Sequence, residues 1–254
     1  MKTKKLISPE FRVNVGCYEL TEGMSVECYS SQEPQADWCR ITLDDEYEGL
    51  LDVKNMDDAV IDLGYDGDFD TLLEGNTSKQ ADDWKTILVR DDMTKLAGIR
   101  ITATFVDCVP SDVVKYILGR AGITDYSLDD SKRKKKDVFV IDGKDGIEAL
   151  EEINAFWGIQ NKFYFQRKRF YWGTKETQNE MYVLEEDETL LSLEKTGDMW
   201  EAETLGIPWL HPGQEVEIIH ASYEGTAEIY KIFVKCDERG FTRMYLYFKE
   251  VTDA

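Results

Sequence analysis

Two histidines, His211 and His220, are the side chains best suited to acid–base or metal chemistry. They lie nine positions apart in GIPWLHPGQEVEIIH (206–220). Histidine titrates near neutral pH and is a common metal ligand, so the pair could form a metal site or half of a catalytic dyad. The stretch also has the pattern of a proline-and-glycine corner leading into a β-strand. Because the chain has no third histidine, we favour the structural interpretation: His211 is a corner residue, and His220 is a strand residue with a hydrogen-bond partner.

Carboxylates are the other candidates for chemistry. DGDFD (66–70) places acids at alternate positions, as a calcium loop does, but Thr71 and Thr77 stand where such a loop needs Gly and Glu. We therefore expect an acidic turn between two strands. A glycosidase-like acid pair is a weaker alternative, since adjacent acids are frequent in so acidic a chain. They occur at 44–45, 57–58, 82–83, 91–92 and 129–130.

The cysteines and the absent motifs also argue against catalysis. No C-x-x-C pair occurs among the cysteines at positions 17, 28, 39, 108 and 236, so we expect reduced thiols packed as small apolar side chains on strands. The motifs G-x-S-x-G, H-E-x-x-H, G-x-x-x-x-G-K-[ST] and G-x-G-x-x-G do not occur. We predict no enzyme, no catalytic residue, no metal ligand and no cofactor.

Two segments could bind a partner. The basic run KRKKK (132–136) has acidic neighbours, which favours a solvated linker; if it binds anything, an acidic patch on another subunit is favoured over DNA. The aromatic segment FYFQRKRFYW (163–172) is expected to form two strands joined by a basic turn. On it, Phe163, Phe165, Tyr164 and Tyr171 could form a sugar-stacking platform. We favour the alternative in which one face covers a helix and the other lies at a subunit interface.

Composition limits the partners. The 254 residues carry 51 Asp and Glu against 30 Lys and Arg, a formal net charge of -21. Such a charge repels phosphate backbones and anionic lipid, so we predict neither sequence-specific nucleic-acid binding nor membrane insertion. The start, MKTKKLISPEF, lacks the apolar run of a signal peptide, and no stretch is long enough for a membrane span. We therefore expect a soluble protein made in a cytoplasm.

The patterning predicts an α+β, mainly β protein in which two small β-barrel-like domains flank a small α/β domain. Residues 1–108 and 178–254 contain short alternating strands separated by turns; in one, Cys39, Ile41 and Leu43 share a face. Between them, residues 109–177 contain two helices, a strand and the aromatic hairpin. The first helix, 109–122, has Ser111 as its expected N-cap and Gly122 at its C-terminus. The second, 146–158, turns Ile147, Leu150, Ile153 and Trp157 inward.

The order of these parts resembles the tail hub proteins of contractile phages. This is the late-control-D-like family, related to the hub part of type VI secretion spikes. Three degenerate stretches carry the resemblance and together span most of the chain. They are DDAVIDLGYDGDFDTLLEGNTS (57–78), ITATFVDCVPSDVVKYILGRAGI (101–123) and LHPGQEVEIIH with the strands that follow it (210–248).

The resemblance implies a virion structural protein, made and assembled in the bacterial host cytoplasm. Such hubs form homotrimers whose paired barrels make a ring between the tail tube protein and the central spike protein, beside other baseplate subunits. A fused lysozyme or peptidase domain, present in some relatives, is not expected after residue 254. We expect subunit or partner contacts at Trp209, Phe163, Phe165, Tyr171 and Trp172. The net charge further suggests an acidic ring lumen that lets DNA pass. A carbohydrate-binding module and a cell-wall hydrolase remain alternatives.

Overall fold

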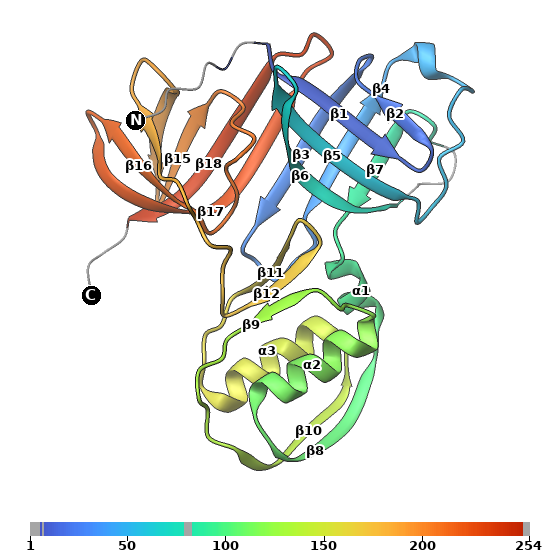
Figure 1. Ribbon diagram of the computed structural model, residues 1–254, viewed down its shortest axis with the longest axis vertical. Coiled ribbons are helices and arrows are strands. Elements are labelled where there is room, and N and C mark those ends of the chain that lie inside the picture. The colour runs from blue at the N-terminus through green and yellow to red at the C-terminus, as the bar shows by residue number, and fades with distance from the viewer. Residues whose placement is uncertain (1–5, 7, 79–82, 251–254) are drawn as a thin grey trace. The chain divides into compact units, whose positions relative to one another are not determined.

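The computed structural model describes residues 6, 8–78 and 83–250, and it describes residue 250 by its backbone alone. These residues form two compact units (Figure 1). Unit 1 comprises the described parts of 1–32, 37–90 and 176–254, and unit 2 comprises 33–36 and 91–175. Strands dominate and helices are few, so the predicted α+β, mainly β class is confirmed. Along the described chain, no helix combines the length and apolar character that a membrane crossing needs.

The first β region of unit 1 is built from short antiparallel strands. They are β1 (Glu10–Val15), β2 (Tyr18–Leu20), β3 (Met24–Ser31), β4 (Trp38–Leu43), β5 (Asp58–Tyr65), β6 (Asp68–Thr77) and β7 (Thr86–Arg90). A single 3-10 turn, Asp45–Tyr47, follows β4. Hydrogen-bonded neighbours run in the order β3-β4-β7-β6-β5-β1-β2.

The second β region of unit 1 has a similar make-up. It contains β13 (Tyr182–Glu185), β14 (Leu190–Thr196), β15 (Met199–Thr204), β16 (Glu215–His220), β17 (Tyr223–Cys236) and β18 (Thr242–Glu250). The fourteen-residue β17 is the link between the regions, because its first half pairs with β16 and its second half with β3. One sheet, thirteen-stranded within the described residues, therefore runs through both regions and is not closed into two barrels.

The alternation read from the sequence builds the core of unit 1. Cys39, Ile41 and Leu43 are at most 1% exposed on one face of β4, as predicted. The register places Cys28 of β3 directly opposite Cys39, and the two form a disulfide. The prediction that all five cysteines are reduced was therefore wrong for this pair. A spacing of eleven residues without a C-x-x-C motif gave no sign that a hairpin register would bring the two sulfurs together.

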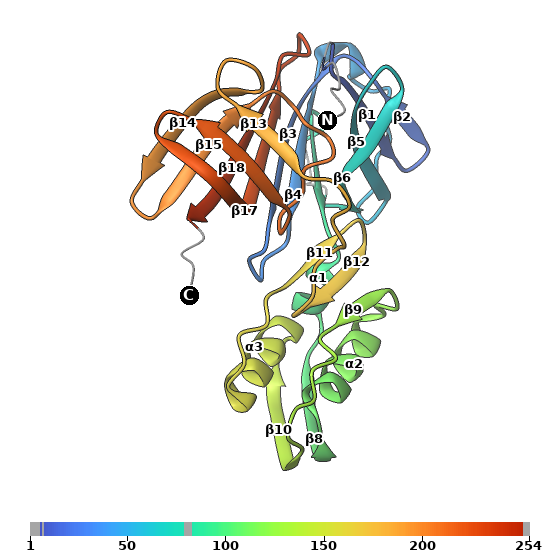
Figure 2. The same cartoon turned by 60° about the vertical axis from the view of Figure 1, so that its left-hand side comes forward.

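Unit 2 packs helices on a small sheet. Its helices are α1 (Met93–Gly98), α2 (Pro110–Ala121) and α3 (Gly146–Trp157). Its strands are β8 (Ile101–Cys108), β9 (Tyr126–Leu128), β10 (Lys136–Lys144), β11 (Phe163–Gln166) and β12 (Arg169–Trp172). Helices α2 and α3 lie side by side against one face of the antiparallel β8–β10 pair, as two views show (Figures 1 and 2). Strand β12 pairs with β11 and, in parallel, with β9.

The ends of the helices are set by local chemistry. Gly122 ends α2 in the left-handed conformation, with φ of 74°, as predicted. The prediction that Ser111 is the N-cap was wrong, because Val109 is the N-cap and no side chain caps α2. Pro110 fixes this start, since its ring suits the first helical turn and needs no hydrogen-bond acceptor. Helix α3 begins with a capping box between Asp145 and Glu148.

Candidate functional site

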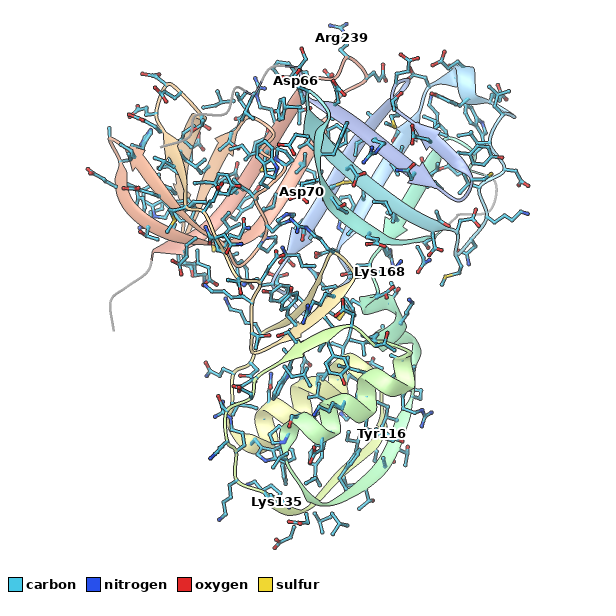
Figure 3. All side chains as sticks on the ribbon, in the orientation of Figure 1. Asp66, Asp70, Tyr116, Lys135, Lys168 and Arg239 are labelled. Carbon is cyan, nitrogen blue, oxygen red and sulfur yellow. A yellow bond between two sulfur atoms is a disulfide. The ribbon has the colours of Figure 1, made fainter. Side chains whose placement is uncertain are left out.

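His211 lies at a structural junction inside unit 1. Its side chain is 5% exposed, and its Nε2 lies 3.3 Å from Oδ2 of Asp70 on β6. Figure 3 labels Asp70 in the middle of unit 1. The backbone N–H of His211 donates to Oε1 of Gln214 at 3.0 Å. The imidazole therefore joins the corner that precedes β16 to a strand 141 positions earlier in the chain.

The corner needs glycine at two positions, Gly206 because of close packing and Gly213 because of its positive φ. A Cβ on Gly206 would stand 2.7 Å from Cγ2 of Thr242 and 3.2 Å from Cδ2 of Leu63, so only glycine fits without movement. The carbonyl of Gly206 accepts a hydrogen bond from the Tyr65 hydroxyl. Burial raises the pKa of Tyr65 to about 12. Gly213 has φ of 91° and donates its N–H to the carbonyl of Ile229 at 2.7 Å.

His220 has separate partners. It is the last residue of β16, where its Nδ1 accepts from the N–H of Ser222 at 3.0 Å and its Nε2 lies 3.5 Å from Glu186. The predicted roles, a corner residue and a hydrogen-bonded strand residue, are confirmed. Within the described residues, no group of three or more His, Cys, Asp and Glu is arranged to hold a metal ion.

The acidic stretch 66–70 is the predicted turn. Asp66 and Gly67 connect β5 to β6 with φ of 51° and 82°, and Asp66 is labelled at this turn in Figure 3. Inside the hairpin, Asp62 is 6% exposed at its side chain and pairs with Arg12 at 2.8 Å. Asp62 also accepts a hydrogen bond from the Thr71 hydroxyl at 2.8 Å. The carboxylate of Asp62 therefore connects β5 to both of its neighbours, β1 and β6. Of the adjacent acids noted in the sequence, residue 82 lies outside the described residues.

The aromatic segment forms the predicted hairpin, and its rings are buried. β11 and β12 are joined by a turn at Arg167 and Lys168, with φ of 48° and 66°; Figure 3 labels Lys168. The rings on one face belong to the core of unit 2, as expected for a face that covers a helix; they are Phe163, Phe165, Phe170 and Trp172. On the other face, Tyr164 and Tyr171 are stacked with centroids 5.5 Å apart and are at most 7% exposed.

This burial bears on two predictions. A sugar-stacking platform needs exposed ring faces, and the single chain presents none on this hairpin among the described residues. The subunit contacts predicted at Phe163, Phe165, Tyr171 and Trp172 stay predictions, because no partner is present to test them. Trp209 lies partly buried against the core of unit 1, so its ring has surface left for a neighbour.

The basic run is a linker, as predicted. Residues 132–135 are exposed and precede β10. Arg133 pairs with Asp129 at 2.9 Å, and Lys135 pairs with Asp107 at 2.8 Å. Burial opposes ionisation of Asp129, but hydrogen bonds donated by Ser131 and Arg133 hold the pKa of its carboxyl well below the usual range.

The outer face of β8–β10 is a candidate assembly surface that the sequence analysis did not single out. Val106 and Val138 stand directly opposite each other in the register, and they are 72% and 52% exposed. Val140 is 50% exposed and pairs with the exposed Thr104. With Thr102, these residues form an exposed, β-branched patch, here named the ribbon face, opposite the face that α2 and α3 cover; the exposed Asp142 borders it on β10. The sequence feature that could have predicted this face is the unbroken apolar run from 138 to 141, which is typical of a strand covered on both faces.

Unit 1 also presents unpaired strand edges. Among the described residues, β2 pairs only with β1, and β14 pairs with β15 and, at Leu190 alone, with Glu186, so each strand ends the sheet order. Leu191 on β14 is 46% exposed. Open edges of this kind are sites where another chain can add, and native proteins usually cover or blunt them.

The fold can be compared with those of known proteins. No protein-family model matches the sequence, and no curated protein does. The solved structures that share its fold include phage tail proteins and a type VI secretion component. Identities of 11–12% make these likenesses ones of fold alone.

Three of these structures span nearly the whole chain. The 43 kDa tail protein of prophage MuSo2 from Shewanella oneidensis has a TM-score of 0.75 and 12% identity, covering 95% of this chain and 98% of that one. A tail protein from Neisseria meningitidis has the same score and identity, with coverage of 96% and 97%. The third is an Escherichia coli type VI secretion component described as similar to the T4 tail proteins gp27 and gp5. It has a TM-score of 0.69 and 11% identity, covering 95% of this chain and 77% of that one.

Proposed function

We propose that this chain is a structural subunit of a phage tail or of a phage-tail-like particle. The observation that carries the proposal is the end-to-end match of its fold to two tail proteins, at a TM-score of 0.75 over at least 95% of either chain. A match over both units and both β regions at once constrains function more than a match of one common domain would. Such a subunit acts by assembly and is not an enzyme.

Within the particle, the proposed role is that of a baseplate hub. The chain joins the tail tube protein to the central spike protein as a ring-forming homotrimer, in contact with other baseplate subunits. It is located in the virion and is assembled in the bacterial host cytoplasm. The resemblance read from residues 57–78, 101–123 and 210–248 supports this finer role, as does the type VI secretion relative in fold.

Surfaces of the single chain support assembly. The ribbon face exposes three valines on a sheet whose other face is already packed. The strands β14 and β2 end the large sheet with edges that are largely unpaired within the described chain. A second copy that covers such surfaces removes apolar area from water and blocks open-ended pairing, and a closed ring does this for every subunit. Trp209, which is partly buried against the core of unit 1, is proposed as a further contact with a neighbouring subunit.

The mass of the purified protein tests the ring. A trimer of 29.3 kDa subunits has a mass of about 88 kDa. Native mass spectrometry of the protein alone, and of the protein mixed with its tail fractions, is expected to find that species or larger complexes built from it. A protein that stays monomeric in both samples would contradict the hub proposal.

A further inference from the structure

Unit 2 contains an open cleft that the proposed tail role leaves unused. Its volume is about 370 Å³, and it is lined by the first residues of α2, the linker segment 129–135 and Trp172. Ligand pockets typically enclose roughly 300–1,000 Å³, so the cleft suits a side chain or a short peptide segment. Its walls are fixed by hydrogen bonds. Trp157 Nε1 donates to the carbonyl of Lys134 at 3.1 Å, and the N–H of Asp129 donates to the carbonyl of Trp172 at 2.8 Å.

The N-terminus of α2 opens into this cleft. The helix is twelve residues long, and no side chain caps its first turn. Val109, Pro110 and Ser111 all line the cleft. In the described part of the chain, the N–H of Ser111 has no recorded acceptor. Unpaired N–H groups and the helix dipole make such an end favourable for an anionic oxygen.

Trp172 gives an independent sign of a ligand. The residue is 1% exposed and lines the cleft, yet its Nε1–H has no hydrogen-bond acceptor among the described residues. Buried indole N–H groups usually have a partner, and an indole can only donate. A ligand that pairs with this atom must therefore supply an acceptor.

The charges around the cleft leave one cation available. Arg133 and Lys135 are paired with Asp129 and Asp107. Lys132 lines the cleft, is exposed, and has no ion pair recorded within the described chain. Asp130 is the opposing charge at the rim, also without a recorded ion pair there.

We propose that this cleft binds a carboxylate from an acidic peptide segment of a partner protein. The carboxylate accepts hydrogen bonds from the indole N–H of Trp172 and from the Ser111 end of α2, while the ammonium of Lys132 balances its charge. Charge selects the partner, because three residues of the basic run 132–136 line the cleft: Lys132, Arg133 and Lys135. A carboxylate is favoured over a phosphate, since one unpaired cation faces the cleft and Asp130 would repel a dianion. The proposal stands apart from the tail assignment and does not depend on it.

Peptide binding to the full chain tests the site. A fluorescein-labelled hexaglutamate peptide, followed by anisotropy, is expected to bind saturably and to be displaced by added salt. Lys132→Ala should weaken binding about fivefold to tenfold, since it removes one charge-assisted contact. The matched control is Lys134→Ala, which removes a neighbouring lysine that does not line the cleft and should change the affinity less than about twofold. Asp130→Asn should strengthen binding about twofold or more, because it removes the opposing charge.

A second set of variants separates the site from simple charge attraction. Trp172→Phe removes the donor and should weaken binding about fivefold to tenfold. Ser111→Pro removes the backbone N–H of the first helical turn, where proline is tolerated, and should also weaken binding about fivefold, with Ser111→Ala, which keeps that N–H, as its control. Equal losses in the Lys132 and Lys134 variants would overturn the proposal, as would hexaglutamine binding as well as hexaglutamate. Inorganic phosphate that binds more tightly than the glutamate peptide would overturn the choice of a carboxylate.

Discussion

Replacing Val106, Val138 and Val140 together by threonine is expected to weaken subunit assembly while leaving the fold intact. Fully burying a valine side chain contributes about 1.5–3 kcal/mol. These three are 72%, 52% and 50% exposed, so covering what remains stabilises an assembly by about 3–5 kcal/mol per copy. Threonine keeps the branched shape and the strand propensity of valine. Each exchange loses roughly one methyl group of apolar burial, about 0.8 kcal/mol, and adds a hydroxyl that a dry interface must accommodate.

The triple variant should therefore raise the dissociation constant by at least about tenfold, because the exposed fractions of the three sites together lose about 1.4 kcal/mol, which corresponds to a factor of ten. The assay is sedimentation velocity over a concentration series, with urea unfolding as the control for stability. Unfolding should change by less than about 0.5 kcal/mol per site, since the valines are exposed in the single chain. A matched control is Leu50→Thr, which alters a side chain that is 66% exposed but lies off the ribbon face. Unchanged assembly in the triple variant, or an equal loss in the control, would refute the assignment of this face.

Three further predictions concern the fold that presents these surfaces. Gly206→Ala should lower the free energy of unfolding by about 1–3 kcal/mol, because its methyl group meets packed side chains; Gly119→Ala, on open helix surface, should raise it by about 0.5–1 kcal/mol in the same urea assay. The raised pKa of Tyr65, about 12 against 10 when unfolded, contributes stability that is complete below pH 10 and is lost as the pH rises toward 12. Unfolding measured from pH 9 to 12 should show this loss, and Tyr65→Phe should make it smaller; an unchanged slope would contradict the burial of the hydroxyl. Non-reducing peptide mapping should recover Cys28 linked to Cys39, and alkylation of both in the untreated protein would contradict the pairing.

Local patterns predicted the elements well. The alternation of β4 gave its extent and its buried face, and the periodicity of α3 gave its extent. Of the four α3 side chains predicted to face inward, Leu150 and Ile153 are buried, whereas Ile147 and Trp157 are only partly buried. The acidic turn at 66–67 followed from its glycine and aspartates. Short helix α1 was missed, because six residues carry too little periodicity to stand out from a loop.

Local sequence patterns could not predict which distant strands pair with each other. The dual role of β17, whose two halves pair with β16 and β3, depends on a register between distant segments. The disulfide follows from another such register. Sequence reasoning placed His211 at a corner, but its partner Asp70 lies 141 positions away, and no spacing rule connects them. The ribbon face could have been recognised, because four consecutive apolar residues in β10 imply that both faces of the strand are covered.

Quantitative mass spectrometry of purified tail particles tests most directly whether this chain is a tail subunit. Particles are isolated from the producing cells by density and size, and the chain is counted against the tube protein of the same particles. A hub trimer predicts three copies of this chain in each particle, retained after high-salt washing. Complete absence of the chain from intact particles would contradict the structural role.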